Sequence, residues 1–300
     1  MVLESIISAE EVERHPLDMF FLGFGTASLG LWLAYYIFPK EASNWFLFLT
    51  AFALEPLLLR LFYLEEKGEI NLERPTIWQR HERVIMDYLF MFFGMVIGLS
   101  FWYAILPQEL TNIMFENQIA EVFRIQNLRV ALTGSTIGTG AAIATQFGPS
   151  LTAILESKTK MLEFIAVNNL RLLFLFAAFS FIFGAGAILL LVWNAAVVGV
   201  AVGNLAREGI TAAHISVRAA AYFKALPVSF LAFFVHGIFE ILGYFVGAIA
   251  GGILSVAIIR KHYNNPHFPT LVMDVIMLIL LSVGLIVVGA FVEVYVTPVL

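Results

Sequence analysis

The sequence contains no cysteine, which excludes structural disulfides, thiolate metal sites and a cysteine nucleophile. Charge is also scarce, because only 13% of the 300 residues are Asp, Glu, Lys or Arg, against about 25% in an ordinary soluble domain. The basic residues form no stripe, so nucleic acid is not an expected partner. Motifs for phosphate binding, dinucleotide binding or metal-dependent proteolysis are lacking. We therefore expect a non-enzymatic protein with no catalytic residue, no metal and no cofactor.

Hydrophobic residues, in contrast, make up 60% of the chain, which is more than a water-soluble core can absorb. About 20 apolar residues in a helix span the hydrocarbon layer, and charge-free stretches of that length recur along the sequence. The fold class predicted is therefore all-α. We expect a polytopic transmembrane helix bundle with broken or hairpin helices, interfacial amphipathic helices and the lipid bilayer as its surroundings.

The first 86 residues are predicted to form an N-terminal part, followed by a membrane domain over 87–300. Acidic residues dominate 1–18, so the positive start of a signal peptide is missing, and a short interfacial helix is expected before Pro16. Two apolar stretches, 19–38 and 45–64, predict a transmembrane hairpin. The polar segment 65–83 contains several Lys and Arg residues and is expected to be a cytoplasmic loop.

In the second part, segment 88–106 is expected to cross the membrane. The spacing of apolar residues over 115–129 predicts a helix that lies at the interface or on other helices. The charge-free segment 130–155 fits a span, a re-entrant segment or a buried hairpin. Arg207, Arg218 and Lys224 are expected on a surface helix.

Two apolar stretches, 172–206 and 226–259, are too long for one straight crossing. Each is predicted to be a hairpin, a broken helix or a tilted helix. Breaks are expected at Gly184 and Gly186 in the first stretch, and at His236 and Gly237 in the second. The final span is predicted over 271–292.

Glycines spaced four apart predict helix faces that approach closely. They fall into three sets: Gly94 with Gly98, Gly199 with Gly203, and Gly243 with Gly247 and Gly251. Such faces fit tight packing within the chain or a homodimer interface, and the spacing does not choose between them.

Ionisable and amide side chains inside apolar stretches need a partner, because an unpaired charge at the bilayer centre costs about 2.5–3.5 kcal/mol. His236 and Glu240 are four apart and share a face of a continuous helix. They could hydrogen-bond each other, bind a cation or pass a proton, or they could be a buried pair that orients helices. The candidate intramembrane polar site comprises His236, Glu240, Asn168, Asn169, Asn194, Asn204 and Glu293.

The order of these residues resembles the stage II sporulation protein M family over about 87–300. The resemblance is carried by Asn168-Asn169, Trp193-Asn194 with Gly199, His236-Gly237-Ile238-Phe239-Glu240, Ala250-Gly251-Gly252, and Glu293 with Thr297-Pro298. It implies a prokaryotic plasma-membrane protein with several spans. In spore-forming bacteria the family member works with peptidoglycan-degrading partners during forespore engulfment. The extra hairpin 19–64 and the long segment 107–167 depart from the bacterial pattern, so we expect an archaeal or other non-sporulating source.

Two functions from different classes follow, ahead of a membrane enzyme with a buried His and Glu as acid and base, for which no nucleophile is identifiable. The first is a membrane-organising or remodelling scaffold that recruits a membrane or cell-envelope partner and forms a homodimer. The second is a transporter or channel whose polar site surrounds His236 and Glu240.

Overall fold

All the elements that the structure describes are helical. A computed structural model describes residues 16–71, 77–133, 151–183, 187–210, 218–264, 266 and 268–296, and within these ranges there is no strand. The helices are α3 (Pro16–Ile37), α4 (Ala42–Asn71), α5 (Ile77–Ile105), α6 (Gln108–Met114), α7 (Glu116–Thr133), α8 (Leu151–Phe183), α9 (Ala187–Ile210), α10 (Arg218–Ile259), the short 3-10 helix η2 (His262–Asn264) and α11 (Phe268–Tyr295).

Seven helices in the described ranges are long and apolar enough to cross a membrane: α3, α4, α5, α8, α9, α10 and α11. This confirms the all-α polytopic fold class. Several predicted elements are also present, namely the hairpin of α3 and α4, the helix α7 and the final span α11. The protein is therefore a multi-pass membrane protein.

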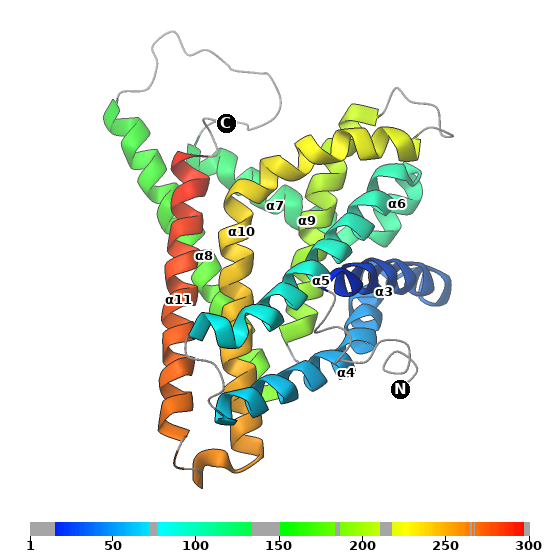
Figure 1. Cartoon of the computed structure of the whole chain (residues 1–300). Helices are drawn as coiled ribbons and strands as arrows, with labels where there is room; N and C mark the ends of the chain where they lie inside the picture. The colour runs from blue at the N-terminus through cyan, green and yellow to red at the C-terminus, as the bar shows by residue number, and fades with distance from the viewer. Residues whose placement is uncertain are drawn as a thin grey trace.

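The two over-long apolar stretches fold differently. The first is divided as predicted, because α8 ends at Phe183 and α9 begins at Ala187. The second is one continuous helix, so the break predicted at His236 and Gly237 is wrong. Figure 1 shows that α10 first runs across the top of the molecule and then turns downward, and the helix contains Pro227. Proline removes one helical hydrogen bond and crowds the preceding turn, which is the usual cause of such a bend.

Two other predictions need correction. The polar segment 65–83 is mostly helical, because α4 continues to Asn71 and α5 begins at Ile77. Arg207 does not share a surface helix with Arg218 and Lys224, because it lies in the last turn of α9 while the other two lie in α10. The helix predicted before Pro16 lies outside the described residues, as does most of the charge-free segment 130–155.

Arg207 of α9 binds the carboxyl end of α5. Its guanidinium donates to the backbone oxygens of Tyr103, at 3.2 Å, and Leu106, at 2.5 Å. It also lies over the Tyr103 ring, 5.7 Å from the centroid. The last carbonyls of a helix have no partner within the helix, so a cation there stabilises them. Arg207 therefore holds the end of α5 against α9.

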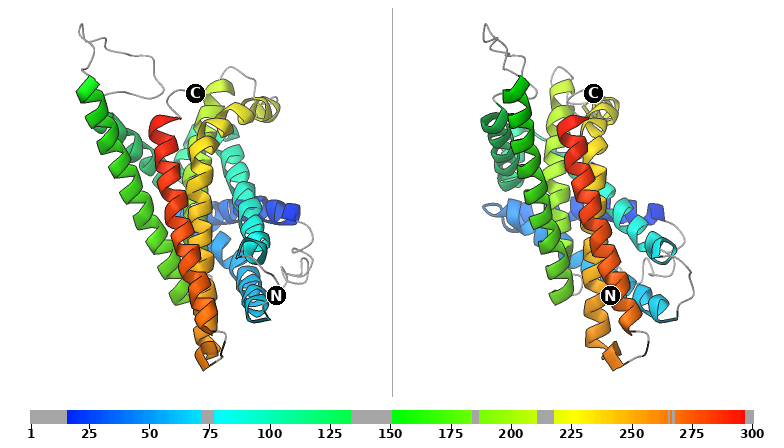
Figure 2. Two further views of the ribbon diagram at one scale, coloured as in Figure 1. Left: turned by 60° about the vertical axis from the view of Figure 1, so that its left-hand side comes forward. Right: turned by 90° about the vertical axis from the view of Figure 1, so that its left-hand side faces the viewer.

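The helices do not all run in one direction (Figure 1). The three views in Figures 1 and 2 are turned about one vertical axis, and in all of them α8, the second half of α10 and α11 run upright. In the same views α3 runs across that direction. The upright helices and α3 therefore cannot all follow the membrane normal.

The paired glycines lie where helices cross inside the chain. A Cβ on Gly94 would overlap the Phe20 backbone of α3, and one on Gly203 would meet Tyr103 of α5. On α10, the Gly251 position faces the Ala177 backbone of α8. The remaining members behave alike, with Gly98 against α3, Gly199 against α5, Gly243 against α11 and Gly247 against α8 and α11.

These contacts show the role of the glycine spacing in packing. Glycine lets two backbones approach until they touch, and here each predicted glycine face is covered by another helix of the same chain. The glycines thus provide internal packing, and a homodimer, if it forms, must use other surfaces.

Candidate intramembrane polar site

The centre of the site is Asn169 of α8, which hydrogen-bonds to two side chains of α10. Its Nδ2 donates to Glu240 Oε1 at 2.5 Å, and its Oδ1 accepts from the Tyr244 hydroxyl at 2.9 Å. Glu240 and Tyr244 are four residues apart, so they share one face of α10 and can both reach the same amide. Asn168 contributes a longer bond of 3.4 Å from its Nδ2 to Asn169 Oδ1. The amide therefore joins two membrane-spanning helices.

Two members of the cluster, Asn169 and Tyr244, are buried. Asn169 is 6% exposed and Tyr244 is 5% exposed, while Glu240 is half-buried. The Tyr244 ring stacks on Phe176 of α8 with 5.0 Å between centroids and 3° between planes. Apolar atoms around an amide and a phenol exclude competing water, so these hydrogen bonds hold α8 and α10 in a defined register.

The third wall of the site is α11. A Cβ at Gly289 would lie 2.8 Å from Glu240 Cγ, so the backbone of α11 passes directly beside that carboxylate's side chain. Glu293 follows one turn later on the same face of α11 and is 7% exposed. The interface of α8, α10 and α11 therefore contains two carboxyl groups, Glu240 and Glu293.

The other predicted site residues lie elsewhere. Asn194 donates from Nδ2 to Leu190 O of its own helix, α9, at 2.8 Å. Asn204, also on α9, accepts from Tyr103 of α5 at 3.5 Å. The backbone of His236 belongs to α10, one turn before Glu240, and its side chain lies outside the part of the molecule that the structure describes.

Two residues of interest escaped sequence reasoning. Tyr244 was overlooked because a tyrosine in an apolar stretch is not unusual, although its position four residues after Glu240 was the available signal. Asp87 of α5 is 2% exposed, and its position next to the polar segment 65–83 gave no sign of this burial.

The residues that meet here limit the chemistry of the site. An amide, a phenol and two carboxyl groups can form hydrogen bonds and exchange protons. Within the described ranges, no three His, Asp or Glu side chains gather as metal ligands.

Comparison with known proteins decides the family. The model of the stage II sporulation protein M family matches residues 88–298. The chain belongs to this family. It is also 32% identical over 137 residues to a protein of Methanocaldococcus jannaschii named only as uncharacterized, a match that covers 45% of this chain and 69% of that protein. No solved structure matches.

Membership of the stage II sporulation protein M family confirms the resemblance drawn from the ordered motifs. The archaeal relative agrees with the expectation of a non-sporulating lineage. The three helices of the polar cluster lie inside the matched range, whereas α3 and α4 precede it. This member of the family therefore combines the matched region with an additional helical hairpin.

Proposed function

We propose that this protein is a non-enzymatic scaffold of the prokaryotic plasma membrane that reshapes the bilayer around it and recruits a membrane or cell-envelope partner. The observation that carries the proposal is the direction of α3, which runs across the upright helices in every view (Figures 1 and 2). If α8, α10 and α11 cross the bilayer, α3 lies along its plane. A 22-residue helix in that position is about 33 Å long.

The composition of α3 supports an effect on lipid packing. No charged residue occurs between Asp18 and Lys40, so this helix is not an amphipathic helix of the kind that rests among the headgroups. Several of its large side chains point outward, with Phe21 67% exposed and Leu29 60% exposed. A helix that displaces lipid at a single depth imposes curvature or local thinning on the bilayer, because the remaining lipid must fill the space above or below the helix.

The burial of Asn169 and Tyr244 favours a scaffold over a solute pathway. A transport site must exchange its ligand with water, whereas Asn169 and Tyr244 are buried, and the Asn169 amide is already hydrogen-bonded to Tyr244 and Glu240. The hydrogen bonds between α8 and α10 stabilise a fixed arrangement of these two helices, which a scaffold requires. A homodimer, built on faces other than the glycine faces, remains part of the proposal.

Reconstitution tests the remodelling step. The full chain is inserted into liposomes at rising protein-to-lipid ratio, and vesicle diameter and bilayer thickness are measured by cryo-electron microscopy. We expect smaller or locally thinned vesicles with the native chain and a weaker effect with Phe21→Ala/Leu29→Ala. The matched control is Leu280→Ala/Phe291→Ala, which removes equally exposed side chains from α11. Native protein that leaves vesicles unchanged would rule out remodelling.

Recruitment is tested in cells. Crosslinking of the plasma-membrane fraction should capture the protein with itself or with a cell-envelope protein. A chain that stays monomeric in lipid and crosslinks to nothing would rule out the scaffold, and one found outside the plasma membrane would refute the localisation.

Transport is the second candidate, because Glu240 and Glu293 share one three-helix interface and two carboxyl groups can pass a proton. Glu240→Gln keeps the size of the side chain and removes the titratable group. If transport is the function, proteoliposomes should show a proton or solute flux that this substitution abolishes. No flux with the native protein counts against it.

A further inference from the structure

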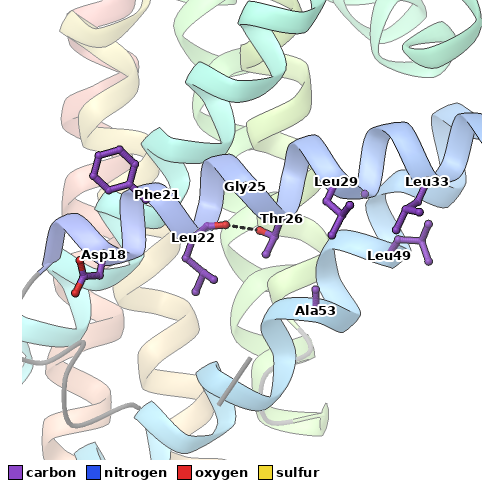
Figure 3. Close-up of a pocket in the computed structure, with 10 residues that line it drawn as sticks. Asp18, Phe21, Leu22, Gly25, Thr26, Leu29, Leu33, Leu49 and Ala53 are labelled. Atoms are coloured by element: carbon purple, nitrogen blue, oxygen red, sulfur yellow. Dashed lines mark hydrogen bonds between the residues drawn. The ribbon is translucent and has the colours of Figure 1, made fainter. Parts of the chain in front are cut away.

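A groove of about 570 Å³ runs between α3 and α4 (Figure 3). Its lining is almost entirely apolar. It is lined by Asp18, Phe21, Leu22, Gly25, Thr26, Leu29, Gly30 and Leu33 of α3 and by Leu49 and Ala53 of α4. The positions on α3 recur every three or four residues, so they form one continuous face of that helix.

The shape of the groove follows from the way the hairpin opens. Leu33 and Leu49 lie close together at one end, and α4 then diverges from α3 toward the end that carries Asp18 (Figure 3). From Asp18 to Leu33 the groove is about 22 Å long at 1.5 Å per residue. One leaflet of hydrocarbon is about 15 Å thick, so an acyl chain fits within this length.

Glycine keeps the middle of the groove open. A Cβ on Gly25 would meet no atom within 4 Å, whereas one on Gly30 would collide with Thr50 of α4. Gly30 is therefore required for the contact between the two helices. Gly25 is not, and the space beside it is free for a ligand.

A single charge marks the open end. Asp18 is the one charged residue of the lining, and the described residues include no hydrogen-bond or ion-pair partner for its carboxylate. Asp18 lies in the first turn of α3. A carboxylate above an apolar groove complements a ligand with a cationic head and a hydrocarbon tail.

We propose that this groove binds one membrane lipid with a protonated amine headgroup, whose ammonium pairs with Asp18 and whose acyl chain lies along Leu22, Gly25 and Leu29. The proposal deepens the proposed function and rests on its placement of α3 inside the bilayer. The same geometry disfavours a lipid with an anionic headgroup, because its charge would be repelled by Asp18.

Native mass spectrometry of the full chain tests this. The protein is released from nanodiscs containing equal amounts of phosphatidylethanolamine and phosphatidylglycerol, and the lipid retained is counted. We expect one phosphatidylethanolamine per chain, retained about fivefold over phosphatidylglycerol, as an exposed ion pair allows. Asp18→Asn should remove this preference, and Gly25→Leu should abolish retention by filling the groove.

The control for Gly25→Leu is Gly284→Leu, which adds the same side chain to an open position on α11 and should leave retention unchanged. If Gly25→Leu fails to fold, Ala53→Leu fills the groove from α4 instead. Equal retention of both lipids by the native chain overturns the proposal. Unchanged lipid retention in both groove-filling variants also overturns it. A protein dimer that Gly25→Leu dissociates would show that a second copy of the chain, not a lipid, occupies the groove. Selective lipid binding without any change in vesicle shape would refute remodelling alone, whereas reshaped vesicles without selective binding would refute the lipid site alone.

Discussion

Replacing Asn169 by leucine should destabilise the protein by removing the amide that joins α8 to α10. The substitution deletes the bond from Asn169 to Glu240 and the bond from Tyr244 to Asn169. Hydrogen bonds between membrane helices contribute about 0.6 kcal/mol each, with a maximum near 1.7 kcal/mol. The buried Tyr244 hydroxyl also loses its acceptor, which adds about 1 kcal/mol. The expected loss is therefore about 2–3 kcal/mol.

The pairwise part of that loss can be isolated by a double-mutant cycle. Tyr244→Phe removes only the hydroxyl, so the cycle of Asn169→Leu with Tyr244→Phe should give a coupling energy of about 0.6–1.7 kcal/mol. Unfolding in nanodiscs is followed by circular dichroism, where a loss of 1 kcal/mol lowers the Tm by roughly 2 °C.

The matched control is Ser282→Ala. The Ser282 hydroxyl is as buried as that of Tyr244, but it bonds to Leu278 O of its own helix at 2.9 Å. Its removal should change stability by less than about 0.5 kcal/mol and show no coupling to Asn169. A coupling energy of zero between Asn169 and Tyr244 would refute the inference that the cluster fastens α8 to α10.

Three further outcomes are expected. Gly251→Val should destabilise by about 3 kcal/mol or more, because its side chain would overlap the α8 backbone, while Gly284→Ala on open α11 should be neutral in the same thermal melt. Arg207→Ala should cost about 2 kcal/mol by freeing the carbonyls at the end of α5, and Arg207→Lys should restore only part of it, so equal melting of both variants would contradict the capping role. The Arg124 hydrogen bond lowers the pKa of Glu121 below its ordinary 4.5, so this pair stabilises the protein above pH 4.5 and loses its effect as the pH falls through the lowered pKa. At this exposed site the loss should stay below about 0.5 kcal/mol, and Arg124→Gln should abolish the pH dependence in acid titrations.

Composition and spacing were sufficient for the class of protein and for most of its helices. The excess of apolar residues indicates a lipid environment without reference to any contact, and the uncharged lengths locate the hairpin of α3 and α4 and the last span, α11. The break between α8 and α9 was also predictable, because Gly184 and Gly186 interrupt a stretch too long for one crossing. The family followed from the order of a few polar motifs.

Local sequence pattern led to wrong predictions where two different structures have the same hydropathy. The over-long stretch at 226–259 contains both Pro227 and the His236-Gly237 pair, and α10 continues through both without a break. Segment 65–83 was taken for a loop because it is polar, yet α4 and α5 extend as helices well into it. Hydropathy measures the preference of a segment for lipid. A helix is stabilised by backbone hydrogen bonds, which can continue past the end of the apolar segment.

The partners of the polar residues required the three-dimensional packing. Glu240 and Asn169 are 71 positions apart, and the distance along the chain carries no information about which amide a carboxylate will bind. The same is true of α3, whose sequence reads as an ordinary span and whose direction across the upright helices depends on Gly94 and Gly98 of α5. The hydrophobicity of a segment depends on its own residues alone, so it can be predicted from the sequence. Direction and pairing arise from side chains on separate segments that must fit together, and they appear only when the helices are packed.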